Sequence, residues 1–285
     1  MTTPRRRTVA LLLVFAATIA LTGVAFAQRG FGGGFRGFRE GGFPYIAAPE
    51  QMPDASFVVC RLAYRQIRRE ESGIGWQTDY PYAEINLTTR FSELTKTRVS
   101  RNEEEEPRHY AVQPLDKALF NCPLLVASDA GTLGFTDAEA DRMREYFRKG
   151  GFMWADDFWG EAAWESFSRE IGKVLPPSEF PIEDIDLADP MLHEQFELTH
   201  IPQITNIQFW RRSGGRETSE RGEETRTPHL RVIRDAHGRV IVVATHNTDV
   251  ADSWEREGED PEFFYQFSPD GYALGIDVVL YVLTH

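Results

Sequence analysis

Carboxylates, an imidazole and an amide follow three apolar segments of the chain, at the points where buried strands would end. The segments are 123–128, 152–155 and 240–245, and the polar residues that follow them are Asp129, Asp156, Asp157, His246, Asn247 and Asp249. An acid placed directly after a buried strand is unfavourable unless it has a partner. In an open α/β sheet, ligands bind beyond the carboxyl ends of the strands. The pattern therefore predicts a polar site at one sheet edge, provided that these strands are neighbours.

The adjacent acids Asp156 and Asp157 allow several kinds of chemistry. A carboxylate at this place can accept hydrogen bonds from a sugar hydroxyl, bind a cation or act as a general base. An Asp after a strand also commonly caps the next helix, so we expect one of the two to have that structural role. Phe158 and Trp159 offer aromatic faces for a sugar ring. The alternative for both is packing beneath a helix.

His246 has the properties of a proton shuttle or a metal ligand, and a hydrogen-bonded structural role is the alternative. Asn247 and Asp249 are also typical of a turn. Glu255, next to Trp254, either contributes to the site or pairs locally. The chain contains neither an HExxH motif nor an EF-hand loop. We therefore predict no cofactor, and the acidic edge leaves a divalent cation, Ca²⁺ or Mg²⁺, as the alternative.

The composition restricts the class of partner. The chain has 285 residues, a hydrophobic fraction of 41% and a formal net charge of −13. A hydrophobic fraction of this size supports a folded core. The negative charge repels phosphate backbones and anionic lipids, so we expect no nucleic-acid partner. Membrane contact is expected only through the N-terminal leader, if the leader is not cleaved.

The first 27 residues have the pattern of a secretory signal peptide. Arg5–Arg7 form a basic region, an apolar run follows, and Ala25–Ala27 form a small-x-small cleavage site. An uncleaved membrane anchor is the alternative, because the apolar run approaches the ~20 residues of a spanning helix. Residues 28–55 follow as a flexible linker rich in Gly, Phe and Arg, and 56–285 form the predicted folded domain. We expect a periplasmic or extracellular location.

The chain has two cysteines, Cys60 and Cys122. Two cysteines exclude a disulfide-rich scaffold and show no zinc-binding spacing. An oxidising compartment would permit a bridge between them. Both lie in or beside apolar, strand-like runs, where a free cysteine behaves as a small hydrophobic residue. We predict two unpaired thiols in the core.

Strands and helices alternate along the predicted domain. The clearest unit is a strand at 123–128, a helix that starts with the capping box of Thr136 and Glu139 and stops at Gly150-Gly151, and a strand at 152–155. Other expected elements are a strand at 57–64, helices at 83–97 and 160–174, a hairpin formed by 230–234 and 240–245, and a helix at 271–285. This order predicts a three-layer, flavodoxin-like α/β sandwich with a mainly parallel sheet.

Residues 150–157, which read GGFMWADD, resemble the GGFLxxDD signature of a family called domain of unknown function 4159. Further matches to that family are Arg61, Tyr64, Asn86, Leu87, Arg90, Asn247, Thr248, Asp249, Trp254, Glu255, Leu274, Gly275, Tyr281, Thr284 and His285. The resemblance extends over about residues 56–285. It implies a fold similar to class I glutamine amidotransferase-like domains, including the trehalose-utilisation type, and it implies no established activity.

Amidotransferases of that fold need a cysteine at a sharp strand-to-helix turn, activated by a histidine. The corresponding turn here, after Ala155, carries Asp156 and Asp157, and Cys122 precedes its strand. No GxSxG motif is present either. We therefore expect no thiol or serine nucleophile.

Three functional hypotheses remain. The first is an exported, non-amidotransferase domain that binds a small polar ligand, such as a carbohydrate, or an envelope protein. The second is a carboxylate-dependent hydrolase that uses Asp156 or Asp157 with His246. The third is a structural domain of an envelope system with the Gly-rich segment as a tether. Hydrogen-bond contact between His246 and these carboxylates in an open cleft would favour the hydrolase.

Overall fold

The computed structural model describes residues 46–70 and 73–285. The predicted leader 1–27 and most of the predicted linker 28–55 lie outside the described residues. Within the described part of the chain, no helix combines the length and the apolar character needed to cross a membrane.

A seven-stranded sheet forms the centre of the fold, with the strand order β3-β1-β4-β6-β9-β8-β7. The strands are β1 (Val59–Leu62), β3 (His109–Val112), β4 (Leu124–Ala127), β6 (Phe152–Phe158), β7 (Ile182–Asp184), β8 (His229–Arg234) and β9 (Val240–His246). The five strands from β3 to β9 are parallel, and β8 and β7 each run antiparallel to the preceding neighbour. Numbered along the chain, the parallel strands have the order 2-1-3-4-5 of flavodoxin-like folds, which confirms the predicted fold class.

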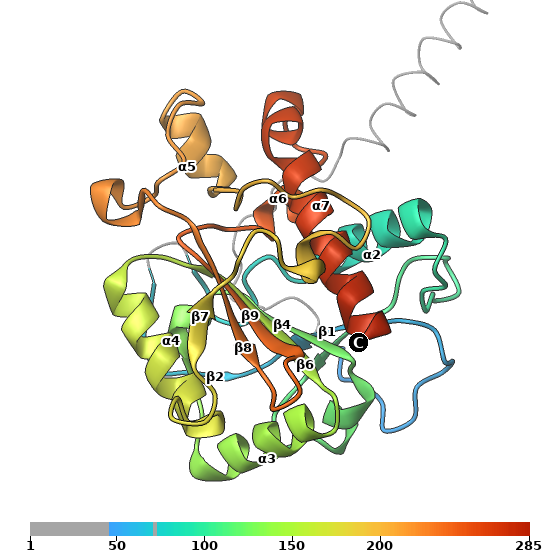
Figure 1. The fold of residues 1–285 in the computed structure, drawn as a ribbon. Coiled ribbons are helices and arrows are strands. Elements are labelled where there is room, and N and C mark those ends of the chain that lie inside the picture. The colour runs from blue at the N-terminus through green and yellow to red at the C-terminus, as the bar shows by residue number, and fades with distance from the viewer. Residues whose placement is uncertain (1–45, 71–72) are drawn as a thin grey trace, which may run out of the picture. The chain divides into compact units, whose positions relative to one another are not determined.

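Helices cover both faces of this sheet (Figure 1). One face carries α2 (Tyr82–Thr95), α6 (Asp252–Glu255) and α7 (Pro261–Thr284), and the other carries α3 (Asp137–Arg148) and α4 (Glu161–Val174). The shorter elements are β2 (Arg65–Gln66), β5 (Leu133–Gly134), α5 (Ile207–Arg212), η1 (Lys117–Asn121), η2 (Ala130–Thr132), η3 (Pro190–Leu192) and η4 (Gly222–Thr225).

Alternating side chains of the strands produce the two cores. In β6, Phe152 and Trp154 pack with the α2 and α7 layer, whereas Met153 and Ala155 pack with the α3 and α4 layer. Successive residues of a strand point to opposite faces, and both faces of a parallel sheet are buried. This explains why the predicted strands read as continuous apolar runs rather than as alternating patterns.

The ends of α3 follow the predicted signals. Thr136 Oγ1 accepts a hydrogen bond from the backbone N–H of Glu139 at 3.3 Å, and Glu139 accepts one in return from the backbone N–H of Thr136 at 2.7 Å. Beyond the helix, Gly150 has a φ of 93°, a conformation that favours glycine. At Gly151 a Cβ atom would lie 2.3 Å from the ring of Tyr146. The chain therefore turns into β6 where only glycines fit.

Several boundaries differ from the predicted ones. The strand β6 continues to Phe158, so Asp156 and Asp157 lie within its last residues rather than after it. The C-terminal helix begins at Pro261, with Asp260 as its N-cap, whereas the apolar pattern predicts a start at 271. The short edge strands β3 and β7 were not predicted, because neither has a long apolar run.

The prediction of two free thiols is wrong, because Cys60 and Cys122 form a disulfide bond with a Cα–Cα distance of 5.8 Å. Cys60 lies in β1, and Cys122 lies just before β4, which pairs directly with β1. The strand order therefore brings the two residues together across a sequence separation of 62. Strand order is a tertiary property that the local apolar pattern did not reveal.

The disulfide is expected to stabilise the domain by about 4 kcal/mol, because it closes a loop of roughly 60 residues in the unfolded chain. We predict that the Cys60→Ser/Cys122→Ser variant has a correspondingly lower free energy of unfolding in urea titrations. Addition of a reductant should lower the stability of the wild-type chain and leave that of the variant unchanged. Equal stability of the oxidised wild type and the variant would contradict this prediction.

Candidate functional site

The carboxyl edge of the sheet contains several residues in the left-handed backbone conformation. Asp129, Asp157 and Asn247 lie at the ends of β4, β6 and β9, with φ values of 50°, 52° and 60°. Asp79, in the segment before α2, has a φ of 64°. Asp and Asn tolerate this conformation better than most residues, and such residues are concentrated at functional sites. Within the described residues, this edge therefore has the strongest backbone signature of a site.

A bulge near the end of β6 sets the direction of its two acids. Between the pairs Ala155–Ala244 and Phe158–His246, β6 has one residue more than β9. The extra residue interrupts the regular alternation of side chains, and a bulge of this kind re-aims side chains beside a site. The two adjacent carboxylates consequently have different surroundings.

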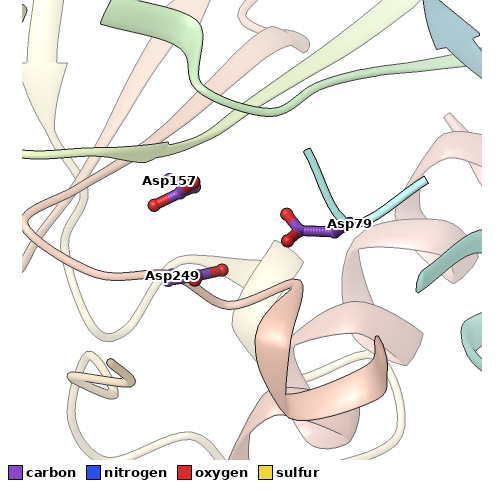
Figure 2. Close-up of side chains that lie close together, drawn as sticks. All are labelled: Asp79, Asp157 and Asp249. Atoms are coloured by element: carbon purple, nitrogen blue, oxygen red, sulfur yellow. The ribbon is translucent and has the colours of Figure 1, made fainter. Parts of the chain in front are cut away.

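Three carboxylates from distant parts of the chain converge at this edge (Figure 2). Asp79 comes from the segment before α2, Asp157 from β6, and Asp249 from the loop between β9 and α6. One oxygen atom of each lies within 4.8 Å of an oxygen of the other two. Asp79 and Asp249 are buried and Asp157 is half-buried, so Asp157 is the most exposed of the three. We call these three residues the acidic triad.

Each carboxylate of the acidic triad accepts one hydrogen bond from the described residues, at one of its two oxygens. The donors are Ser128 Oγ to Asp79 (2.9 Å), Trp159 Nε1 to Asp157 (3.1 Å) and the backbone N–H of Asp252 to Asp249 (3.0 Å). The second oxygen of each carboxylate accepts no hydrogen bond from any described residue. The triad is thus held in place and still has lone pairs available.

Arg61 positions Asp79, although sequence reasoning assigned it no role at the site. The fully buried Arg61 side chain pairs with Glu84 of α2 at 2.5 Å and donates to the carbonyl of Thr78 at 2.8 Å. Thr78 directly precedes Asp79, so this contact fixes the backbone that presents the carboxylate. An arginine in the middle of an apolar strand was the available signal, because a buried charge needs a partner.

A second acidic group shares Asp79 with the acidic triad. Asp252 and Glu255 of α6 lie within 4.8 Å of Asp79 by their oxygens. Arg256 contacts both, with Nε at 3.4 Å from Asp252 and 2.8 Å from Glu255. This second group therefore already contains a positively charged side chain, that of Arg256, and Glu255 pairs with it locally. No Lys or Arg of the described chain forms an ion pair with Asp157 or Asp249.

Burial dominates the electrostatics of the site. Desolvation raises the pKa of Asp157 and of Asp249 well above the ordinary value, and neighbouring carboxylates raise both further. Burial also raises the pKa of Asp79, which the nearby Arg61 partly opposes. Shifted carboxyl pKa values of this kind are typical of functional sites. Without a positive ligand, the triad binds protons more readily than an exposed Asp does.

Asp156, unlike Asp157, has a structural role. Its carboxylate accepts hydrogen bonds from Thr245 Oγ1 and from the backbone N–H groups of Val250 (3.3 Å) and Ala251 (2.8 Å). Trp154 Nε1 donates to the same Thr245 hydroxyl at 2.8 Å. The side chain therefore fastens the loop after β9 to β6. The expectation that one of the two adjacent acids caps the next helix is wrong, because α4 follows Gly160 and has no side-chain cap.

Asp129 lies at the same edge but outside the acidic triad. Its Oδ2 accepts a hydrogen bond from the backbone N–H of Gly75 at 2.8 Å, and its buried Oδ1 has no hydrogen-bond partner in the described chain. Burial raises its pKa to about 7. A Cβ atom at Gly73 would lie 2.4 Å from this carboxylate. The segment 73–75 thus covers Asp129 closely.

His246 is directed away from the carboxylates. Arg231 Nη1, which can only donate, lies 3.1 Å from Nδ1 of His246, so Nδ1 accepts and the protonated Nε2 donates to the carbonyl of Gly160 at 3.1 Å. Burial lowers the pKa of this imidazole to about 4. Both ring nitrogens are therefore engaged, and neither bonds to Asp156 or Asp157.

Asn247 and Trp159, which were also predicted at this edge, have structural contacts as well. Asn247 accepts from the backbone N–H of Gly160 at 2.9 Å and donates to the carbonyl of Thr227 at 3.0 Å. The ring of Trp159 is 4% exposed, which leaves little surface for stacking on a sugar. Its role at the edge is to hold Asp157 through Nε1.

Replacement of Asp156 by Ala is expected to destabilise the domain by about 2–4 kcal/mol, because it leaves two buried backbone N–H groups, those of Val250 and Ala251, without an acceptor. The free energy of unfolding measured in urea tests this expectation. The matched control is Asp141→Ala, which removes a carboxylate with 75% of its side chain exposed and should change stability by less than about 0.5 kcal/mol. Equal effects of the two substitutions would contradict the structural role of Asp156.

The buried acids also predict an unusual pH dependence. The pKa values of Asp129, Asp156 and Asp252 are raised by burial to about 7, so the folded state binds protons more tightly than the unfolded state. The resulting stability is present at low pH and is lost as the pH rises through 7. With a chelator present, the free energy of unfolding should fall by at least about 2 kcal/mol between about pH 5.5 and 8.5. An increase over this range would contradict the prediction.

A comparison with protein families matches residues 60–283 to the model of a domain of unknown function, DUF4159. The match extends from β1 into α7 and contains all three residues of the acidic triad. A search of curated proteins found no match. Since the family model covers most of the chain, the protein belongs to the DUF4159 family.

Proposed function

We propose that this domain binds a hard divalent cation, Ca²⁺ or Mg²⁺, through the acidic triad Asp79, Asp157 and Asp249. The observation that carries the proposal is the convergence of three carboxylates, each with one oxygen that accepts no hydrogen bond from the described residues. Ca²⁺ prefers oxygen ligands at 2.3–2.6 Å, so two oxygens on one ion are at most about 5 Å apart. The triad oxygens lie within 4.8 Å of one another and meet this requirement.

A cation would also remove the main electrostatic penalty of the site. Like charges at this separation in a poorly solvated place repel strongly, and the raised pKa values of Asp157 and Asp249 reflect this repulsion together with burial. Three protein carboxylates leave several of the 6–8 coordination positions of Ca²⁺ open. A small ligand with hydroxyl or carboxylate oxygens could fill these positions. The proposed function is therefore cation-dependent binding of a small polar ligand.

Thermal unfolding and calorimetric titration of the full chain with CaCl₂ and MgCl₂ test the proposal. At about 10 mM, at least one of the ions should raise the Tm of the wild-type chain saturably. Asp157→Asn and Asp249→Asn should each weaken binding at least about tenfold. Asparagine suits position 157, because it tolerates the left-handed backbone.

The same variants separate a binding role from a structural one. In the presence of a chelator, Asp157→Asn should be at least as stable as the wild type, because it relieves repulsion among buried acids. The control Glu165→Gln alters an exposed acid of α4 and should change neither stability nor cation binding. The proposal is refuted if neither ion shifts the wild-type Tm, or if both Asn variants bind as tightly as the wild type.

A carboxylate-dependent hydrolase is the second candidate, and the backbone of Asp157 favours it. This residue is the last but one of a central strand and has a strained, left-handed backbone, and nucleophiles at sharp strand-to-helix turns are likewise strained. The hydrogen bonds of His246 to Gly160 and Arg231 argue against that histidine as its partner. Asp249 is the group beside Asp157 that could share a proton with it. Hydrolysis of a chromogenic ester or glycoside that is lost in Asp157→Asn would distinguish this function from binding alone.

We also propose that the domain is exported and meets its ligand or an envelope protein outside the cytoplasm. The leader pattern in residues 1–27 supports this, and so does the bond between Cys60 and Cys122, since structural disulfides persist mainly in oxidising compartments. Recovery of the full chain in the cytoplasmic fraction of its cells would contradict export.

A further inference from the structure

A cavity of about 370 Å³ lies at the carboxyl ends of β1 and β3, apart from the acidic triad. Its lining residues are Ala63, Tyr64, Arg65, Trp76, Gln113 and Glu139. Ala63 and Tyr64 follow β1, Gln113 follows β3, and Glu139 belongs to the first turn of α3. The cavity therefore lies at the carboxyl end of β1, next to the switch point between β1 and β4, where the order of the parallel strands reverses. Ligands commonly bind at such a switch point.

Three polar side chains of the lining have donor or acceptor atoms that form no hydrogen bond with the described residues. Neither the guanidinium of Arg65 nor the side-chain amide of Gln113 bonds to another described residue. Glu139 uses Oε2 for Thr136 at 2.7 and 2.8 Å, which leaves Oε1 available. The lining thus combines a strong donor, an acceptor and an amide that can do both.

Two aromatic residues complete the lining, and its two charged side chains balance each other. Trp76 is half-buried and Tyr64 is buried, so the indole supplies an apolar surface beside the polar groups. One cation, Arg65, and one anion, Glu139, leave the lining without net charge. A phosphate or carboxylate ligand would meet Glu139, and an ammonium ligand would meet Arg65. The balance favours a neutral ligand that has many hydroxyl groups and an apolar face.

We propose that this cavity is a binding site for a neutral mono- or disaccharide. A pyranose ring presents CH groups that pack on an indole, and its hydroxyls suit Arg65, Gln113 and Glu139. The volume is within the range of small-ligand pockets, roughly 300–1,000 Å³. The site goes beyond the proposed cation binding and does not require a metal ion.

The structure also connects this cavity to the acidic triad. The Tyr64 hydroxyl contacts the carbonyl oxygens of Ser128 and Asp129 at 2.8 and 2.9 Å. Trp76 lies three residues before Asp79, in the segment that Arg61 holds at the Thr78 carbonyl. A saccharide on Trp76 therefore contacts the same short segment that carries one ligand of the proposed cation site.

Ligand-observed NMR on the full chain, with D-glucose, D-mannose, N-acetylglucosamine and maltose as probes, tests the proposal. At about 10 mM, at least one probe should show saturation transfer in the presence of a chelator. Arg65→Ala, which removes an exposed side chain without a partner in the described chain, should weaken binding at least about fivefold, and Trp76→Ala should abolish it. Tyr265→Ala, which removes an aromatic ring that is 77% exposed, is the control and should leave binding unchanged.

The outcomes are decisive even if Trp76→Ala does not fold, because Arg65→Ala and Gln113→Ala alter surface side chains only. If none of the four probes binds to the wild type, the proposal is overturned. Binding that Arg65→Ala and Gln113→Ala both retain in full also overturns it. Because the assay contains a chelator, failure of the cation proposal does not affect this result.

Discussion

The repulsion among carboxylates at the carboxyl edge of the sheet is the constraint on which the account depends. Asp79, Asp157 and Asp249 are brought within 4.8 Å of one another in a place where solvent screens them poorly. An arrangement of this kind destabilises the folded state unless protons or a cation neutralise it. The domain retains it with few compensating contacts, since each carboxylate accepts a single hydrogen bond from the residues that the structure describes. Stability alone does not explain such an arrangement, and this is the reason for proposing that the triad binds a cation.

The surrounding structure holds these groups in position by several independent means. The bulge in β6 separates the roles of two adjacent acids, so that Asp156 fastens the loop after β9 and Asp157 enters the triad. The buried ion pair of Arg61 and Glu84 fixes the segment before Asp79. In the neighbouring group, Arg256 compensates part of the negative charge of Asp252 and Glu255. A preorganised set of ligands at the end of a rigid sheet loses little entropy on binding.

The sequence was sufficient for the fold class and for part of the site. Continuous apolar runs, the capping box at Thr136 and the glycines before β6 are local signals, and they predicted the parallel sheet and most of its helices. The acids near the ends of β6 and β9 pointed to the edge that holds the acidic triad, because parallel strands end on the same side. Asp79 was missed, since it lies in a polar segment and does not directly follow a predicted strand. Its contribution depends on Arg61 and on the path of the chain between β2 and α2.

The roles of individual residues were less accessible from the sequence. Whether Asp156 or Asp157 faces the site depends on a bulge, and the direction of His246 depends on Arg231 of a neighbouring strand. The disulfide between Cys60 and Cys122 depends on the pairing of β1 with β4. All three are consequences of tertiary contacts, whereas the apolar pattern reports only local burial. The cavity at Trp76 likewise arises from four segments that are distant in the sequence.

Anomalous X-ray scattering from crystals of the protein soaked in Mn²⁺, which takes the same oxygen ligands as Mg²⁺, tests the central claim most directly. The account predicts one strong anomalous peak bounded by the carboxylates of Asp79, Asp157 and Asp249, and no such peak in crystals of Asp157→Asn. A featureless map at this edge, or a peak that persists unchanged in the variant, would contradict it.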